Sequence, residues 1–256
     1  MQLRCEDVTC EIDPRAGGRV TALRVGELDV LLTPDDDPRN HGMFPMAPWA
    51  GRTRDGRFRF GDVTHHLPIN QPPHAIHGTV RDRPWTLEDA NPLHARLSCD
   101  LGTDWPFDGW AEQAITLLDD RLELTLSVHT ADAPMPASLG WHPWFRKPTK
   151  VELKAATMYE RDNDHITLRT TKKPPKGPFD DCFTDIARPP KLTWGSQLAL
   201  TIESDCPCIV VYDEPAASTC IEPQTAPPDA LNHDDAAIVT PDEPLRAAMT
   251  WRWTRL

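Results

Sequence analysis

The sequence lacks any long uninterrupted hydrophobic run, and its basic residues are scattered rather than clustered. No apolar stretch near its start suits a signal peptide, and none elsewhere is long enough to span a bilayer. Its 27 Lys and Arg stand against 39 Asp and Glu, a net charge of −12, which excludes the concentrated positive surface that nucleic acid requires. We therefore expect a cytoplasmic protein that binds neither membranes nor nucleic acid, and that forms a monomer or a homodimer.

The chain also lacks the patterns of a disulfide framework and of a metal site. Its seven cysteines are odd in number and irregular in spacing, which favours reduced thiols. Cys206 and Cys208 are separated by one residue, which is too tight for the usual pair of zinc ligands. His74 and His77 lie three residues apart, yet no carboxylate or cysteine pattern accompanies them. The sequence therefore predicts no metal and no cofactor.

Helical periodicity is scarce, and 27 prolines leave little room for long helices. Period-two alternation recurs instead. In "RLELTLSVH" the apolar residues from Leu122 to Val128 share one face, and "LRAAMTWRW" repeats the pattern from Leu245 to Trp253. Similar short stretches bounded by turn residues are "RFRFG", "HARLSCDLG", "AEQAITLL", "QLALTIES" and "CIVVYD". These patterns predict many short strands in sheets that pack face to face.

No internal repeat and no clear linker divides the chain. The nearest candidate for a linker is "RTTKKPPKGPFDD", residues 169–181, which we interpret as a long surface loop. We therefore predict a single domain over residues 1–256. The fold class expected is all-β, a large antiparallel β-sandwich.

Four segments interrupt the alternation with polar residues held in rigid surroundings: "MAPWAGRTRDGRF", "HAIHGTVRDRPW", "SLGWHPWF" and "CIEPQTAPPDALN". In the first, Arg52 offers several donors for a hydroxyl group or an anion, although a solvated surface arginine also fits. In the second, His77 precedes Gly78, which permits close approach of backbone or ligand.

The third and fourth segments supply a candidate acid and a candidate base. Trp141, Pro143 and Trp144 restrict where His142 points, and a fixed imidazole with a pKa near neutrality suits general acid catalysis. A hydrogen-bonded core histidine is the alternative. Glu222 ends an apolar run, so we expect it at the lip of a sheet, where desolvation raises its pKa and makes it a better base. A glutamate in a surface turn is the alternative there. Taken together, these rigidly framed groups indicate an acid–base pocket.

The four segments resemble, in the same order, the motifs of the aldose 1-epimerase family, the galactose mutarotases. The family pattern is N/G-Arg-x-x-x-Gly-Arg-aromatic, then "IHG", then "G-x-HPYF", then "EP-x-T-x-PPDA"; the chain has "GRTRDGRF", "AIHG", "GWHPWF" and "IEPQTAPPDALN". The likeness extends from about Phe44 to about Asn232. It implies a galactose mutarotase-like β-sandwich and a small-molecule sugar as substrate. Two departures bear on the pocket: Trp144 stands where the family usually has tyrosine, and His74 where many members have asparagine.

The resemblance also implies roles for individual residues. Glu222 matches the catalytic base, His142 the catalytic acid, and His77 the histidine that holds the sugar and assists at the ring oxygen. Arg52 matches the arginine that binds sugar hydroxyls. Asp180 fits a D-x-x-F pattern that grips hydroxyls, with its neighbour Asp181 as the alternative.

Trp144 is a further expected contact, since tryptophan faces complement the apolar side of a pyranose. The predicted function is interconversion of the α and β anomers of a free hexose or pentose without a cofactor.

Three other functions stay open at this stage. A hexose-6-phosphate 1-epimerase needs a basic cluster, for which the candidates are Arg52, Arg54, Arg57, Arg81 and Arg83. A non-catalytic carbohydrate-binding protein needs no matched acid and base. A glycoside hydrolase needs two facing carboxylates, and the possible partners for Glu222 are Glu112 and Asp180.

Overall fold

Alternating sequences form the central strands of the structure, a computed structural model that describes residues 1–256. In β13 (Arg121–Thr130) the apolar residues from Leu122 to Val128 are buried, and their polar neighbours are mostly partly exposed. β24 (Leu245–Arg255) lies antiparallel to it, with Leu124 opposite Met249. These strands contribute to one hydrophobic core of 51 buried residues. The period-two pattern therefore predicted both the strands and their buried faces.

Eighteen strands form one large antiparallel sheet. Its strands follow one another, in order of pairing, as β10 (Thr86–Asn91), β11 (His94–Asp100), β12 (Gly109–Leu117), β13, β24, β20 (Leu198–Ser204), β19 (Asp180–Trp194), β21 (Cys208–Tyr212), β22 (Ser218–Gln224), β15 (Gly140–Pro143), β5 (Met43–Met46), β3 (Arg19–Val25), β2 (Val8–Asp13) and β1 (Gln2–Cys5). Four further strands join this succession: β4 (Leu28–Asp29) pairs with β3, β16 (Phe145–Arg146) with β22, β17 (Lys150–Arg161) with β19, and β18 (Thr167–Lys172) with β17.

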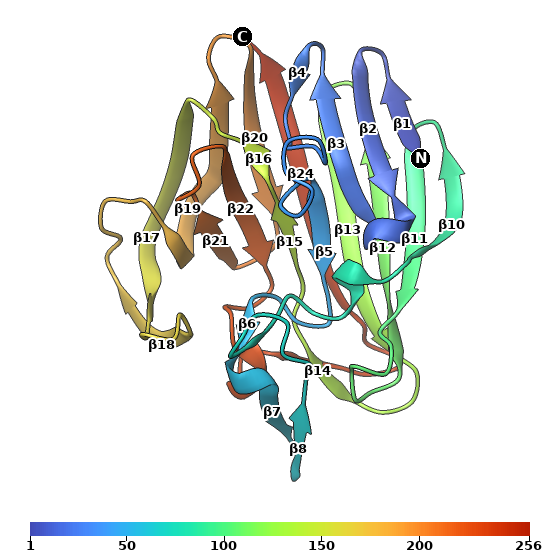
Figure 1. Cartoon of the computed structure of the whole chain (residues 1–256), viewed down its shortest axis with the longest axis vertical. Coiled ribbons are helices and arrows are strands. Elements are labelled where there is room, and N and C mark those ends of the chain that lie inside the picture. Colours follow the sequence, from blue (N-terminus) through green and yellow to red (C-terminus); the bar gives the residue numbers. More distant parts are fainter.

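The two ends of this succession approach each other. The backbone N–H of Arg4 in β1 donates to the carbonyl of Pro92, between β10 and β11, at 2.8 Å. Figure 1 shows β1 and β2 beside β10 to β12, so that the sheet curls around its core and is nearly barrel-shaped. The predicted all-β, antiparallel fold class is confirmed.

Short elements gather at one end of the large sheet (Figure 1). They include three two-stranded pairs, namely β6 (Arg52–Thr53) with β9 (Ala75–Ile76), β7 (Arg57–Phe60) with β8 (Val63–His66), and β14 (Met135–Ala137) with β23 (Ala237–Val239). The helical turns are η1 (Pro14–Ala16), η2 (Arg54–Gly56), η3 (Val80–Asp82) and η4 (Ala230–Asn232). None of these three-residue turns is long or apolar enough to cross a membrane.

One local prediction was wrong. Residues 169–181 are not a continuous loop, because β18 includes Arg169–Lys172 and β19 begins at Asp180. Polar side chains such as Thr170 and Thr171 tolerate the exposed outer strand of a sheet, where no apolar face is required. The true loop between the two strands runs from residue 173 to residue 179. All seven cysteines are free thiols, as predicted.

Candidate functional site

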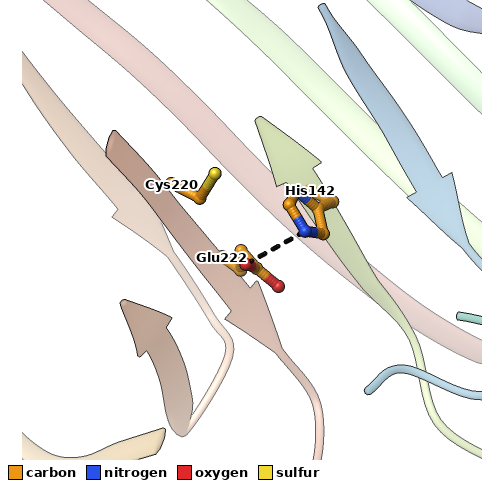
Figure 2. A group of neighbouring side chains, drawn as sticks. All are labelled: His142, Cys220 and Glu222. Carbon is orange, nitrogen blue, oxygen red and sulfur yellow. Dashed lines mark ion pairs between the residues drawn. The ribbon is translucent and has the colours of Figure 1, made fainter. Parts of the chain in front are cut away.

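His142 and Glu222 meet across two neighbouring strands. β15 and β22 pair at Gly140 and Gln224. The same antiparallel register, continued by two residues, brings His142 opposite Glu222. Nε2 of the imidazole lies 3.3 Å from Oε1 of the carboxyl group, and the two residues are only 6% and 2% exposed (Figure 2). Glu222 lies within β22 rather than at the lip of the sheet, so that part of the prediction was wrong.

Aromatic rings fix the orientation of His142. Phe44, its register partner on β5, stacks on the imidazole with ring centroids 4.9 Å apart and an interplanar angle of 25°. Trp144 also stacks, at 4.9 Å and 21°. The ring of His77 meets the same imidazole edge-on at 5.0 Å. The rigid residues around His142 therefore hold the imidazole itself.

His77 is placed by an unusual backbone conformation. Its φ is 64°, in the left-handed region that few residues other than glycine adopt. Gly78 follows with a φ of 73°, and a Cβ there would lie 1.9 Å from the carbonyl oxygen of Ala47. The N–H of His77 donates to the carbonyl of Gly51 at 3.0 Å. The predicted close approach at Gly78 is thus made by backbone, and it turns His77 toward His142.

A cavity of about 240 Å³ brings most of the predicted residues together. Glu222, His142, His77, Arg52 and Asp180 all line it, as does Asp181. Its volume is below the roughly 300–1,000 Å³ of pockets for drug-sized ligands, which suits a ligand as small as a monosaccharide. Trp144 does not line this cavity, because it packs behind the imidazole.

Arg161 connects the two aspartates. Its Nη1 donates to Asp180 at 2.7 Å, and its Nε lies 3.0 Å from Asp181. Both carboxylates therefore face the same guanidinium at the wall of the cavity. Of the two, the charge of Asp180 is the one that raises the pKa of Glu222. Arg52 forms no ion pair and presents its guanidinium to the cavity.

Burial controls the protonation of the central groups. Desolvation raises the pKa of Glu222 well above its ordinary value of 4.5, and the charge of Asp180 raises it further. Burial lowers the pKa of His142 from 6.5 to about 3, with help from the charges of Arg81 and Arg19. The expectation of a near-neutral pKa for His142 was therefore wrong. The single proton of the pair lies on Glu222, with His142 neutral.

The model of the aldose 1-epimerase family matches residues 7–252, which is nearly the whole chain. The chain belongs to the aldose 1-epimerase family. No curated protein matches it significantly.

Solved structures share the fold of this family member at low sequence identity. A galactose mutarotase-like protein from Clostridium acetobutylicum is 19% identical, with a TM-score of 0.89 and coverage of 100% of this chain and 95% of the other. One from Lactobacillus casei is 15% identical, with a TM-score of 0.85 and coverage of 99% of each chain. A galactose 1-epimerase from Lactobacillus acidophilus is 15% identical, with a TM-score of 0.83 and coverage of 99% and 93%.

Sequence reasoning missed several polar residues in the cavity of this epimerase-family chain, among them Gln71, His165, Thr167 and Glu214. Arg161, Tyr212 and Gln224 also line it. Gln224 had a signal, since it lies two residues after Glu222 and so shares its face of β22. Arg161 and Tyr212 had none, because each sits at the end of a strand whose partners lie far away in the sequence.

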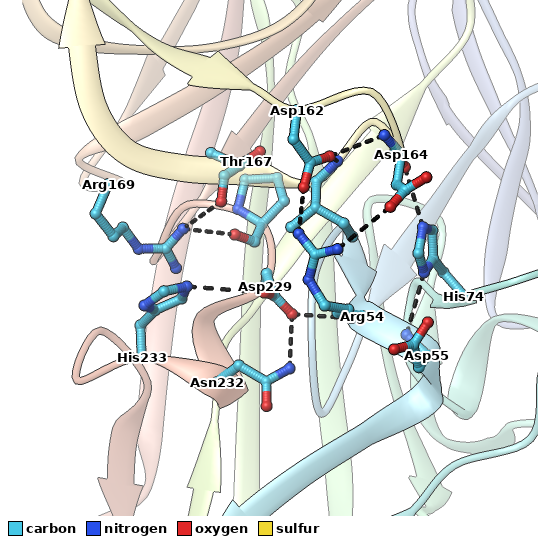
Figure 3. Close-up of polar contacts among 12 residues, drawn as sticks. Arg54, Asp55, His74, Asp162, Asp164, Thr167, Arg169, Asp229, Asn232 and His233 are labelled. Atoms are coloured by element: carbon cyan, nitrogen blue, oxygen red, sulfur yellow. Dashed lines mark hydrogen bonds and ion pairs between the residues drawn. The ribbon is translucent and has the colours of Figure 1, made fainter.

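Both ring nitrogens of His74 are engaged in hydrogen bonds to neighbouring loops. Its Nδ1 accepts a hydrogen bond from the N–H of Asp55 at 3.1 Å, so its Nε2 carries the proton and donates to the carbonyl of Asp164 at 3.0 Å. Arg54 pairs with Asp162 and lies 3.5 Å from Asp164 (Figure 3). These contacts fix the turn between β17 and β18 against η2.

Asp229 of the fourth motif has a similar structural role. Its Oδ1 accepts hydrogen bonds from the backbone N–H of Arg54 at 2.9 Å and from Asn232 at 2.8 Å (Figure 3). The motif thereby anchors the segment that carries Arg52. Asp229 therefore contributes to the cavity by holding the backbone next to Arg52.

One group of side chains near the cavity has the atoms of a metal site. The ligand atoms of His142, Cys220 and Glu222 lie within 4.8 Å of one another (Figure 2). Zinc accepts this donor set, but its cysteine ligand must be a thiolate. Burial raises the pKa of Cys220 well above its ordinary value, which opposes the thiolate. The arrangement suits proton exchange between His142 and Glu222 better than metal binding.

Proposed function

We propose that this protein is an aldose 1-epimerase that interconverts the α and β anomers of a free hexose or pentose. The observation that carries the proposal is the buried contact of 3.3 Å between His142 and Glu222 at a cavity of monosaccharide size. A matched acid and base has no use in a protein that only binds a sugar.

The reaction consists of two proton transfers and one bond rotation. A base removes the proton from the C1 hydroxyl while an acid protonates the ring oxygen, and the hemiacetal opens to an aldehyde. A half-turn about the C1–C2 bond exposes the other face of the carbonyl. Reclosure returns both protons, so Glu222 and His142 regain their starting states. Each acid or base step contributes roughly 10²–10⁴ in rate, and no cofactor is required.

Glu222 acts as the base and His142 as the acid in this scheme. Because the proton of the pair lies on Glu222, it first passes to His142 across their contact. Arg52 favours this transfer, since its charge lowers the pKa of Glu222. The guanidinium of Arg52 and the carboxylate of Asp180 then bind sugar hydroxyls. His77 contacts the sugar near its ring oxygen.

Neither carboxylate that the sequence offered as a partner for Glu222 stands free in the cavity. Asp180 is paired with Arg161, and Glu112 lies on β12 outside the cavity, where it accepts a hydrogen bond from Trp110. A hydrolase needs an acid and a second carboxylate across the glycosidic bond. The geometry therefore supports epimerisation over hydrolysis.

Two substitutions test the proposal by polarimetry of freshly dissolved galactose and glucose. We expect Glu222→Gln and His142→Asn to lower kcat by at least about 100-fold, since each removes one proton carrier. Glu112→Gln is the matched control and should keep the wild-type rate. Wild-type rates in either active-site variant, with folding verified by circular dichroism, would show that the residue is structural.

A further inference from the structure

A second cavity, of about 560 Å³, adjoins the first. His77 and His142 line both cavities, and so do Gln71 and Ile76. The rest of the wall of the second cavity includes Phe44 and three arginines: Arg19, Arg39 and Arg81. A ligand group in the second cavity would therefore lie next to the catalytic histidines.

Arg19 is a buried cation without a counterion. It is 8% exposed and forms no ion pair. Its Nη1 donates to the carbonyl of His41 at 2.6 Å, and its Nε has no partner. Burying an unpaired charge is costly, so such a group is expected where a ligand supplies the missing charge.

The other charges do not neutralise this wall. Arg81 donates to Asp82 at 2.9 Å, but the carboxylate of Asp82 is 71% exposed and therefore solvated. Arg39 is exposed and forms no ion pair. His41 adds no counterion, since it is a base whose pKa is lowered by burial. Three guanidinium groups thus face one exposed carboxylate.

Backbone packing fixes the position of these arginines. A Cβ at Gly17, whose φ is 83°, would lie 1.8 Å from the carbonyl oxygen of Arg81, so only glycine lets the turn before β3 touch η3. The guanidinium carbons of Arg19 and Arg81 lie 4.9 and 5.8 Å from the ring centre of Phe44. The same ring stacks on His142, which connects the positive wall with the acid–base pair.

The other basic candidates from the sequence are engaged elsewhere or face the first cavity. Arg54 is paired with Asp162, and neither Arg57 nor Arg83 lines either cavity. Arg161 is neutralised by Asp180 and Asp181. The uncompensated positive charge is therefore concentrated in the second cavity.

We propose that the second cavity binds an anionic substituent of the sugar, so that the preferred substrate is an aldose that carries a phosphate or carboxylate group. This inference rests on the proposed epimerase function and narrows it, since free neutral aldoses would then be the poorer substrates. Arginine recognises both anions through paired hydrogen bonds. A bound anion would also offset the charges of Arg19 and Arg81, which favours the protonated form of His142 that donates to the ring oxygen.

The test compares kcat/KM for glucose, glucose 6-phosphate and glucuronate in the wild-type protein. We expect a value at least about tenfold higher for one of the two anionic sugars, and the better of the two identifies the anion. Arg81→Gln should lower the ratio of anionic to neutral kcat/KM by about 10-fold or more. Arg59→Gln, an exposed arginine on β7, is the matched control and should leave the ratio unchanged.

Arg19→Gln provides a second variant, with folding verified by circular dichroism, and should lower the same ratio. Equal use of neutral and anionic sugars, with a ratio that neither substitution changes, would overturn the anion site and leave the epimerase function standing. Inhibition by inorganic phosphate without any preference for anionic sugars would assign the cavity to a free anion and would overturn the substrate inference.

If no sugar is turned over, the proposed function itself fails. Calorimetry then decides the anion site independently, by comparing binding of glucose 6-phosphate, glucuronate and glucose to the wild-type protein and to Arg81→Gln. Tighter binding of an anionic sugar that is lost in the variant supports the site. Equal binding of all three sugars contradicts it.

Discussion

At the residue scale, burial of Glu222 raises the pKa of its carboxyl group and at the same time destabilises the folded protein. The folded protein holds this carboxyl neutral, because its pKa is raised well above 4.5, whereas the unfolded chain ionises it near that value. Below pH 4.5 the carboxyl is protonated in both the folded and the unfolded state, so it no longer affects the free energy of unfolding. As the pH rises above 4.5, ionisation favours the unfolded state, and the folded protein loses stability until its own pKa is reached.

We therefore predict that Glu222→Gln stabilises the protein at pH 7 to 8. Glutamine cannot ionise, so the gain in free energy of unfolding should grow by roughly 1 kcal/mol for each pH unit above 4.5, up to the pKa of the folded carboxyl. Urea denaturation at pH 8 and pH 4 measures this, and the gain should vanish at pH 4. A variant less stable than the wild type at pH 8 would contradict the burial of a neutral carboxyl.

The low pKa of His142 predicts an unusual pH profile. The acid–base pair works while it holds one proton, and His142 gains a second only near its pKa of about 3. With a neutral aldose, kcat/KM should therefore stay flat from pH 6.5 down to 4.5, where an ordinary histidine would titrate. Saturation-transfer NMR, corrected for uncatalysed mutarotation, measures the rates. An acid limb between pH 6 and 7 would show that His142 keeps an ordinary pKa.

Some residues of the site could be identified from the sequence, and others could not. His142 and Glu222 stand in rigid motifs, and their order along the chain matches the family pattern. The position of Trp144 behind His142 follows instead from the pairing of β15 with β5, which the sequence does not state. The unpaired state of Arg19 is likewise invisible until the fold shows what surrounds it.

At the scale of elements, alternation predicted strands such as β12, β13 and β24, because one buried face requires every second residue to be apolar. It did not reveal β17 and β19, the two longest strands. It failed at β18, whose side chains are largely exposed. Backbone conformation, rather than alternation, determines the segment between β9 and η3. His77 and Gly78 both have positive φ and hold the loop against Ala47. This loop positions a predicted site residue through backbone contacts alone.

Gly78→Ala should therefore both destabilise the protein and weaken sugar binding. The added Cβ would occupy the position of the carbonyl of Ala47, and the left-handed conformation adds about 1–3 kcal/mol of strain. Urea denaturation and KM for galactose measure the two effects. Gly195→Ala is the matched control, since its φ is also positive at 53° but open space surrounds the position. Equal losses in both variants would show that the contact with Ala47 contributes nothing.

At the scale of the whole molecule, one core joins elements from both ends of the chain. Leu3 of β1 and Trp251 of β24 are both fully buried in the same cluster. The strand succession also returns from β1 to the turn after β10. No part of the large sheet can separate without exposing apolar surface shared with the rest.

We predict that residues 1–256 unfold as one cooperative unit. Thermal melting followed by far-ultraviolet circular dichroism and by tryptophan fluorescence should give coincident transitions, because both report on the same core. Limited proteolysis should yield no stable fragment. Two separate transitions, or a resistant fragment with its own melting curve, would indicate two domains.

The sequence by itself determined the all-β class, several of the central strands and the four polar motifs, because alternation and rigid turn residues act over a few neighbouring positions. Only the tertiary structure decided that Glu222 and His142 touch, that Arg161 joins Asp180 and Asp181, and that Arg19 faces a second cavity uncompensated. These facts depend on strand register and on burial, which arise when segments distant in the chain pack together. Desolvation, which sets the pKa of both central groups, exists only after that packing.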